Sequence, residues 1–349
     1  MTSTSAKIAR RGVLVAMAAG LCASLVPVSA MAQDAAEFYA GKTVTIYVGF
    51  GPGGGYDLYG RLVAEFLGEH IPGNPDIIVE NMPGAGGRLA AQSMYAVAPQ
   101  DGTALSVVVQ SVAMDSAIGA IPGDIDASEF NAVGRLTANY ELGISWNETG
   151  IETFEDTLTN PVAFASTGAG SASAFVPLML NDLEGAQYNV IQGYEGVAPA
   201  RLALESGEVD AMMAGLAGLQ SSNPEWIEDG IVNVLWQLST EPHPDFPDVP
   251  AIGQLGETED EQAMYRLVAG AADIGRSLIT TPNVPEDRLA ALREAFDAMV
   301  ADPAFIEAAA QRNLDLDILS GEELQAVMDS QVNVSDAAIE MTRSYVMAQ

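Results

Sequence analysis

The chain has 349 residues, 48% of them hydrophobic and 17% charged, a composition that excludes wholesale disorder and leaves room for one large or two ordinary globular domains. Acidic residues dominate, because 47 Asp and Glu stand against 14 Lys and Arg and give a formal net charge of -33. Such a charge repels nucleic-acid phosphates and anionic lipid, so we expect neither a nucleic-acid partner nor a polybasic membrane anchor.

Residues 1–32 are predicted to be a cleavable export signal. Basic residues precede a short apolar run, and Ala30-Met31-Ala32 supplies a small-residue cleavage motif. The pair Arg10-Arg11 is typical of a twin-arginine signal, but Ala9 replaces the usual Ser or Thr, so the general secretory route stays open. No later apolar stretch reaches the length of a bilayer span. We therefore expect a periplasmic protein whose mature chain makes no stable insertion into the membrane.

Beyond residue 32, apolar runs typical of strands alternate with helical segments. A strand predicted over 43–50 is followed by a glycine-rich turn and by apolar residues at helical spacing up to Gly68. The same order of strand, turn and helix returns over 77–97, and further strands are predicted at 104–109, 162–166, 188–192, 211–213 and 232–238. This alternation predicts an α/β fold with parallel sheets, whose ligands bind at the carboxyl ends of the strands.

The C-terminal part of the chain is predicted to be mostly helical. Prolines make 242–250 a surface connection, and one more strand is predicted over 271–281. Helices are then predicted over 285–300, 303–311 and 321–345, each opened by a Pro, Asp or Ser-Gly signal.

Four glycine-rich turns at the ends of predicted strands are the candidate functional elements. The first covers 49–55 and leads into a helix with Asp57 in its first turn. Without Cβ atoms, backbone N–H groups can point outward together, and a helix start adds partial positive charge. Such a turn can bind an anion without a basic side chain.

The same turn also fits a dinucleotide-binding fingerprint. Gly49, Gly51 and Gly54 satisfy G-x-G-x-x-G, and Glu80 ends the next strand, where a ribose-binding acid would sit. A secreted dinucleotide-dependent oxidoreductase is therefore the alternative function. Pro52 in the turn and export to a compartment without a ready pool of nicotinamide cofactor disfavour this alternative.

The order of the motifs closely resembles the periplasmic substrate-binding receptors of tripartite tricarboxylate transporters, the Bug-type family. The segment over 80–87 is the most specific piece, and the matching segments are 44–57, 79–87, 98–103, 168–173, 194–196, 207–210 and 246–250. The resemblance implies an α/β two-domain clamshell of the periplasmic-binding-protein type II, each domain a mostly parallel sheet flanked by helices. We expect domain 1 to comprise 33–138 plus 265–349, and domain 2 to comprise 139–264, with the ligand cleft between them.

The resemblance also implies a receptor, not an enzyme. It would capture a small organic carboxylate and deliver it to a membrane permease with a large and a small subunit; a sensory carboxylate-binding protein is a further alternative. A monomer is expected. No catalytic residue, cofactor or metal is expected, because Cys22 lies in the export signal, His70 and His243 are the only histidines, and no nucleophile-elbow or P-loop motif occurs.

In the family that it resembles, ligand carboxylates are held largely by backbone amides and ordered waters from loops of both domains. Carried over by motif, the resemblance nominates as ligand-binding residues Phe50, Gly53, Gly54, Gly55, Tyr56, Asp57, Pro83, Gly84, Ala85, Gly86, Thr167, Gly168, Ser171, Ser173, Tyr194 and Glu195. Asp57 cannot itself attract an anion, so we expect it to cap the helix or to fix a neighbouring N–H group.

Three positions depart from the family pattern. Ala174 stands where many relatives carry a histidine, Met82 where they often carry Arg, and Tyr56 where they carry Thr or Ser. These departures make the wall of the site bulkier and more aromatic. They favour an apolar or ring-bearing monocarboxylate over citrate.

Overall fold

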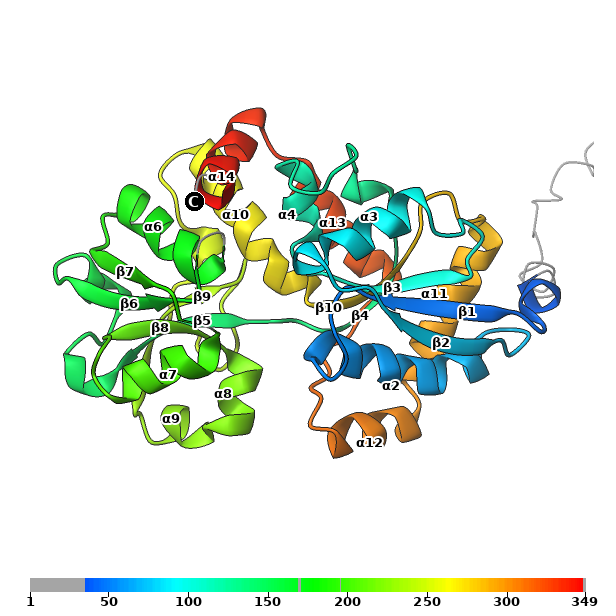
Figure 1. Cartoon of the computed structure of the whole chain (residues 1–349), viewed down its shortest axis with the longest axis horizontal. Helices are drawn as coiled ribbons and strands as arrows, with labels where there is room; N and C mark the ends of the chain where they lie inside the picture. Colours follow the sequence, from blue (N-terminus) through cyan, green and yellow to red (C-terminus); the bar gives the residue numbers. More distant parts are fainter. Residues whose placement is uncertain (1–34, 169–170, 195, 348–349) are drawn as a thin grey trace, which may run out of the picture.

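The computed structural model describes residues 35–168, 171–194 and 196–347, and Figure 1 shows two α/β lobes side by side. A six-stranded sheet forms the centre of one lobe and a five-stranded sheet the centre of the other. Helices cover both faces of each sheet. Within the described residues, no helix combines the length and the apolar character needed to cross a membrane.

The first lobe is built on a sheet with the order β11-β4-β10-β3-β1-β2. β1 pairs in parallel with β2 and β3, whereas β10 lies antiparallel between β3 and β4. The strands are β1 (Thr43–Val48), β2 (Asp76–Asn81), β3 (Ala104–Val108), β4 (Asn131–Thr137), β10 (Arg276–Thr280) and β11 (Leu319–Ser320). The helices of this lobe are α2 (Gly55–His70), α3 (Arg88–Ala96), α4 (Val112–Ala117), α11 (Glu286–Val300), α12 (Pro303–Gln311) and α13 (Gly321–Val332).

Alternating side chains explain the first β-loop-α unit of this lobe. Along β1, Val44, Ile46 and Val48 are buried, and the residues between them are more exposed. Helix α2 covers these three side chains with Leu62 and Val63, which fall on one helical face and belong to the same buried cluster.

The second lobe has the strand order β7-β6-β8-β5-β9. β6 pairs in parallel with β7 and β8, and β5 lies antiparallel between β8 and β9. Its strands are β5 (Glu141–Trp146), β6 (Val162–Ser166), β7 (Tyr188–Gln192), β8 (Ala211–Gly215) and β9 (Val232–Leu238). Its helices are α5 (Phe154–Thr157), α6 (Ala172–Glu184), α7 (Val197–Glu205), α8 (Leu216–Ser222) and α9 (Pro224–Glu228).

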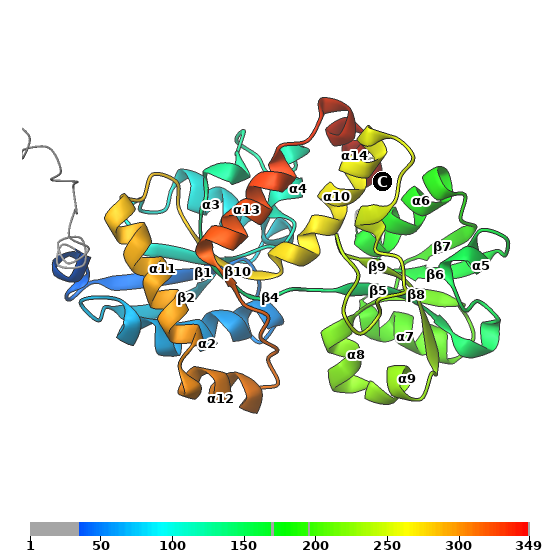
Figure 2. The same cartoon turned by 180° about the vertical axis from the view of Figure 1, so that it is seen from behind.

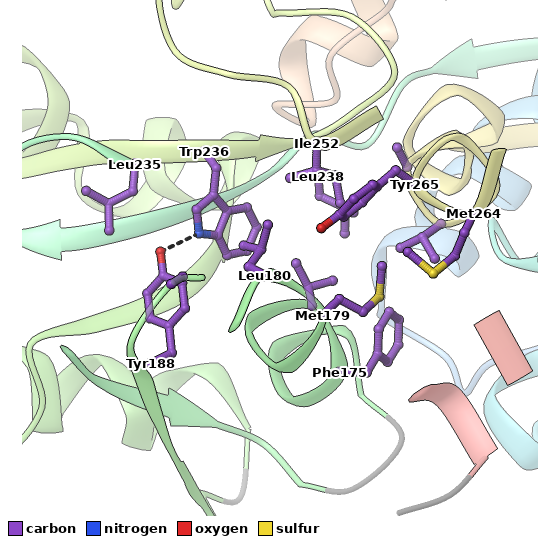
Figure 3. Close-up of a cluster of buried hydrophobic side chains, with 14 of the residues drawn as sticks. Phe175, Met179, Leu180, Tyr188, Leu235, Trp236, Leu238, Ile252, Met264 and Tyr265 are labelled. Carbon is purple, nitrogen blue, oxygen red and sulfur yellow. Dashed lines mark hydrogen bonds between the residues drawn. The ribbon is translucent and has the colours of Figure 1, made fainter. Parts of the chain in front are cut away.

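Trp236 of β9 is the largest side chain in the core of the second lobe (Figure 3). It is fully buried, its ring stacks on Phe164 at a centroid distance of 6.2 Å, and its Nε1–H donates to the hydroxyl of Tyr188 at 3.0 Å. Gly143 on the neighbouring strand makes room for the indole, because a Cβ there would lie 2.1 Å from Trp236 Cε2. Burial raises the pKa of Tyr188 to about 12, so this hydroxyl stays protonated.

The predicted α/β class is confirmed, and both sheets are mixed, with most strands of each running in one direction. The antiparallel strand in the middle of each sheet, β10 in the first lobe and β5 in the second, follows a passage of the chain from the other lobe. The strand predicted over 271–281 is wrong in its first part, since α10 (Glu259–Ile274) continues to Ile274 and Gly275 ends it before β10. The long helix predicted over 321–345 is two helices, α13 and α14 (Asp336–Met347).

The chain passes between the lobes at the β4–β5 connection, along α10, and between α13 and α14 (Figures 1 and 2). α13 packs on β4 in the first lobe, whereas α14 packs on α10 and on α6 in the second lobe. Ala338 and Val346 of α14 share a buried cluster with Phe175 and Met179 of α6. The division of the chain at 138/139 and 264/265 stays a prediction.

Candidate ligand-binding site

The first glycine turn joins β1 to α2 and is fixed by the buried carboxylate of Asp57. Its Oδ2 accepts from the Gly53 N–H at 2.8 Å and from Arg61 Nε at 2.8 Å, and its Oδ1 accepts from Asn81 Nδ2 at 2.8 Å. The hydrogen bond from Arg61 is the main cause that lowers the pKa of Asp57 to about 2. Asp57 thus holds a neighbouring N–H group, as its expected role requires, and shapes the turn from inside.

We expect Asp57→Asn to destabilise the protein by about 1–3 kcal/mol at neutral pH, because the amide cannot accept both charge-assisted bonds. A carboxyl whose pKa is lower in the folded state stabilises the fold above the unfolded pKa of 3.8, and this stability is lost as the pH falls towards about 2. Urea unfolding of both proteins should therefore show their difference narrowing below pH 4. A difference that is constant from pH 7 to pH 3 would contradict this role.

The second glycine turn follows β2 and is pressed against the first. Asn81 Nδ2 also donates to the carbonyl of Phe50 at 2.9 Å, which ties the two turns together. A Cβ at Gly49 would lie 2.8 Å from the Gly87 Cα, and a Cβ at Gly87 would lie 2.9 Å from the Val109 Cβ. Only glycine allows this approach of the two backbones. Of the nominated residues here, Pro83, Ala85 and Gly86 are exposed and Gly84 is half-buried.

Tyr56 and Phe50 form a stacked aromatic pair over the first turn, with ring centroids 4.2 Å apart. The hydroxyl of Tyr56 accepts from the Gln110 backbone N–H at 3.1 Å, and Gln110 is the second residue after β3. Burial raises the pKa of this hydroxyl. The carboxyl ends of β1, β2 and β3 are thereby joined into one surface, which contains the nominated residues of the first lobe.

Across from this surface, the nominated residues of the second lobe follow β6 and β7. Ser173 is buried, and its Oγ accepts from the Thr167 N–H at 3.0 Å and lies 2.9 Å from Ser171 Oγ. Ser171 Oγ donates to the carbonyl of Gly168 at 2.6 Å. These hydroxyls organise the turn before α6.

Tyr194 lies at the start of the next turn, after β7. Its hydroxyl donates to Glu208 Oε1 at 2.9 Å, so this polar group already has a partner within the lobe. Glu195 lies outside the described residues, as does the predicted export signal over 1–32.

A groove of about 600 Å³ separates the two lobes. One wall belongs to α8 of the second lobe, with Ala217, Gln220 and Ser221; the other belongs to α12 and the segment after it, with Asn313 and Asp315. The carbonyl of Asp315 accepts from the hydroxyl of Tyr59 on α2 at 2.7 Å, which places the groove beside the first turns of that helix. A smaller cavity of about 210 Å³ lies within the second lobe between α7, α8 and β8, lined by apolar side chains and Arg201.

The sequence did not reveal a polar cluster beside the first glycine turn, which is formed by Gln110, Asn139 and Arg276. Gln110 could have been found by the rule that residues after a strand carry binding groups, because it is the second residue after β3. Arg276 gave no such signal, since it fell inside the predicted strand over 271–281, and Asn139 lies in a β4–β5 connection that the sequence pattern did not reveal.

Two α/β lobes, a groove between them, and turns from both lobes at the carboxyl ends of strands define a solute-binding receptor of the clamshell type. The family model described as "Tripartite tricarboxylate transporter family receptor" matches residues 60–343, and the chain belongs to this family. The family consists of binding proteins, so the chain is a receptor and not an enzyme, and the oxidoreductase alternative is rejected.

Solved structures agree with the fold. A solute-binding protein of the same family from Polaromonas, solved without ligand, aligns with a TM-score of 0.67 at 20% identity over 89% of this chain and 100% of its own. The periplasmic binding protein BugD gives a TM-score of 0.56 at 22% identity over 88% of this chain and 98% of its own. MatC from Rhodopseudomonas palustris, solved with bound malate, gives a TM-score of 0.54 at 23% identity over 85% of this chain and 99% of its own. The type II clamshell predicted from the motifs is confirmed.

Proposed function

We propose that this protein is a periplasmic receptor that captures a small organic carboxylate between its lobes and delivers it to a tripartite permease with a large and a small membrane subunit. The observation that carries the proposal is the family match over 60–343, and the paired glycine turns at the carboxyl ends of β1 and β2 support it. The malate bound by MatC supports carboxylates as the ligand class. Export by the signal over 1–32 and a monomeric state are part of the proposal.

Anion binding by such a protein depends on local dipoles, because the overall charge of -33 repels an anion. The first turn of the 16-residue helix α2 provides partial positive charge beside the groove. In this proposal Asp57 holds the Gly53 N–H, the backbone N–H groups of 54–55 and 84–86 bind one end of the carboxylate, and the second lobe contributes Thr167, Ser171 and Tyr194 from the opposite side. Closure is a hinge motion that the ligand stabilises by binding the closed state more tightly.

A thermal-shift screen of the ligand-stripped protein tests this function. Succinate, malate, adipate, citrate and benzoate form the panel, with NAD and glucose as controls. We expect at least one acid to raise the melting temperature by several degrees, since a ligand at about 100 times its Kd adds about 2.7 kcal/mol to the folded state. Silence of every acid would overturn the proposal, as would a shift with NAD alone.

A further inference from the structure

Arg276 opens β10 and lies between the first glycine turn and the β4–β5 connection. Its guanidinium carbon lies 4.0 Å from the centroid of the Tyr56 ring, and a Cβ at Gly55 would lie 3.7 Å from its Nε. The positive charge is therefore held against the first turn of α2, where the helix dipole has the same sign. Both charges act on the same space at the start of α2.

Neutral amides hold Arg276 in place. Its Nη1 donates to Gln110 Oε1 at 2.8 Å and its Nη2 donates to Asn139 Oδ1 at 3.2 Å. Stacking on Tyr56 fixes the plane of the guanidinium. Each amide accepts one of the N–H groups, and the remaining N–H groups of the fork stay available to a carboxylate.

Five of the ten described arginines have a carboxylate oxygen within 4.0 Å, and Arg276 is among the five that do not. Arg61, Arg88 and Arg135 each lie 2.7–2.8 Å from a carboxylate oxygen of Asp57, Asp115 and Asp317. Among the residues that the structure describes, no carboxylate lies within 4.0 Å of Arg276. Arg276 is distinguished from the other arginines without an acidic partner by its position against the first glycine turn, where its guanidinium stacks on the Tyr56 ring.

The nearest acidic group to Arg276 along its hydrogen-bond network is Glu141, the first residue of β5. Asn139 Nδ2 donates to Glu141 Oε1 at 3.3 Å, so one amide separates the two charges. Burial raises the pKa of the Glu141 carboxyl, and Arg276 opposes this effect. An anion on Arg276 would be repelled by an ionised Glu141.

We propose that Arg276 is the carboxylate-binding side chain of this receptor. The guanidinium, oriented by Gln110, Asn139 and the Tyr56 ring, donates its remaining N–H groups to one carboxylate of the ligand beside the first glycine turn. The inference rests on the proposed function and adds to it: recognition uses a direct ion pair besides backbone amides, and it requires a carboxylate in its charged form rather than any group of that shape.

Isothermal titration calorimetry of Arg276→Gln tests the proposal. The probes are malate, adipate and benzoate, each paired with its uncharged amide. We expect Arg276→Gln to weaken binding of the acid at least tenfold and binding of the amide less than threefold. Arg266→Gln, on the exposed face of α10, removes the same charge and should leave both affinities within twofold.

Glu141→Gln makes the opposite change in charge, because it removes a negative group instead of a positive one. We expect Glu141→Gln to tighten acid binding at least twofold, because it removes a neighbouring negative charge, and Arg276→Lys to recover part of the loss. Equal weakening of acid and amide in Arg276→Gln, or no weakening, overturns the inference. If Arg276→Gln does not fold, the Glu141→Gln variant decides: an affinity for the acids that is unchanged or weaker than that of the wild type overturns the inference about Arg276. Failure of the wild-type protein to bind any of the acids contradicts the proposed function instead.

Discussion

Replacement of Trp236 by alanine should lower the free energy of unfolding by about 3–5 kcal/mol. The indole is fully buried, stacks on Phe164 and gives its N–H to Tyr188, so the substitution leaves both a large cavity and an unpaired hydroxyl in the core (Figure 3). The gap cannot be filled from Gly143, which has no side chain. Urea unfolding followed by circular dichroism measures the loss.

Trp146 provides the matched control for this change. It lies in the same lobe and packs edge-on against Trp226, with centroids 5.3 Å apart, but it is only half-buried. Trp146→Ala should therefore cost less than half as much as Trp236→Ala. A loss below about 1 kcal/mol for Trp236→Ala would show that the second lobe tolerates this cavity and that its stability has another source.

Substitution of Gly87 by alanine should cost about 2–4 kcal/mol and weaken carboxylate binding, because two unfavourable effects add. The residue has φ +93, a conformation that side chains disfavour, and its Cβ would lie 2.9 Å from the Val109 Cβ and 3.2 Å from the Phe50 ring. Relief of that contact must push Phe50 away from Tyr56 and separate the two glycine turns. Calorimetric titration with the acid found in the screen, together with urea unfolding, measures both effects.

Two other glycines provide controls that separate the effect of backbone strain from the effect of steric contact. Gly86 has φ +65 with nothing within 4 Å of a Cβ, so Gly86→Ala should cost only about 1–2 kcal/mol from backbone strain. Gly51 has neither a positive φ nor a close neighbour, so Gly51→Ala should stay within about 0.5 kcal/mol of the wild type. Equal effects at Gly51 and Gly87 would contradict the tight approach of the turns.

Sequence patterns predicted the parts of the fold that are formed by residues close together in the chain. The β1-turn-α2 unit follows from alternating apolar residues, a glycine turn and a helical apolar face, all within 30 residues of one another. The role of Asp57 also followed from sequence, because it acts on Gly53, four residues away. The family resemblance supplied the clamshell and the receptor class.

These patterns could not predict the pairing of strands that lie far apart in the sequence. The mixed sheet of the first lobe depends on β10 entering between β3 and β4, which are more than a hundred residues earlier in the chain. The last half of helix α10 is largely buried, so its end over 271–274 lacks a clear polar face and fits the strand pattern predicted over 271–281. Gln110 and Asn139 orient Arg276, and these residues come together only in the folded chain.

The places where the chain passes between the lobes determine how they can move. All three connections join the lobes along the same side of the molecule as α10 and α14, so any motion of one lobe against the other must bend each of them. α8 and α12 line the groove from opposite lobes, so such a motion changes the distance between them. Because Cys22 is the only cysteine in the sequence, dyes on cysteines introduced at Ser221 and Asn313 would report that motion by energy transfer without labelling any other described residue.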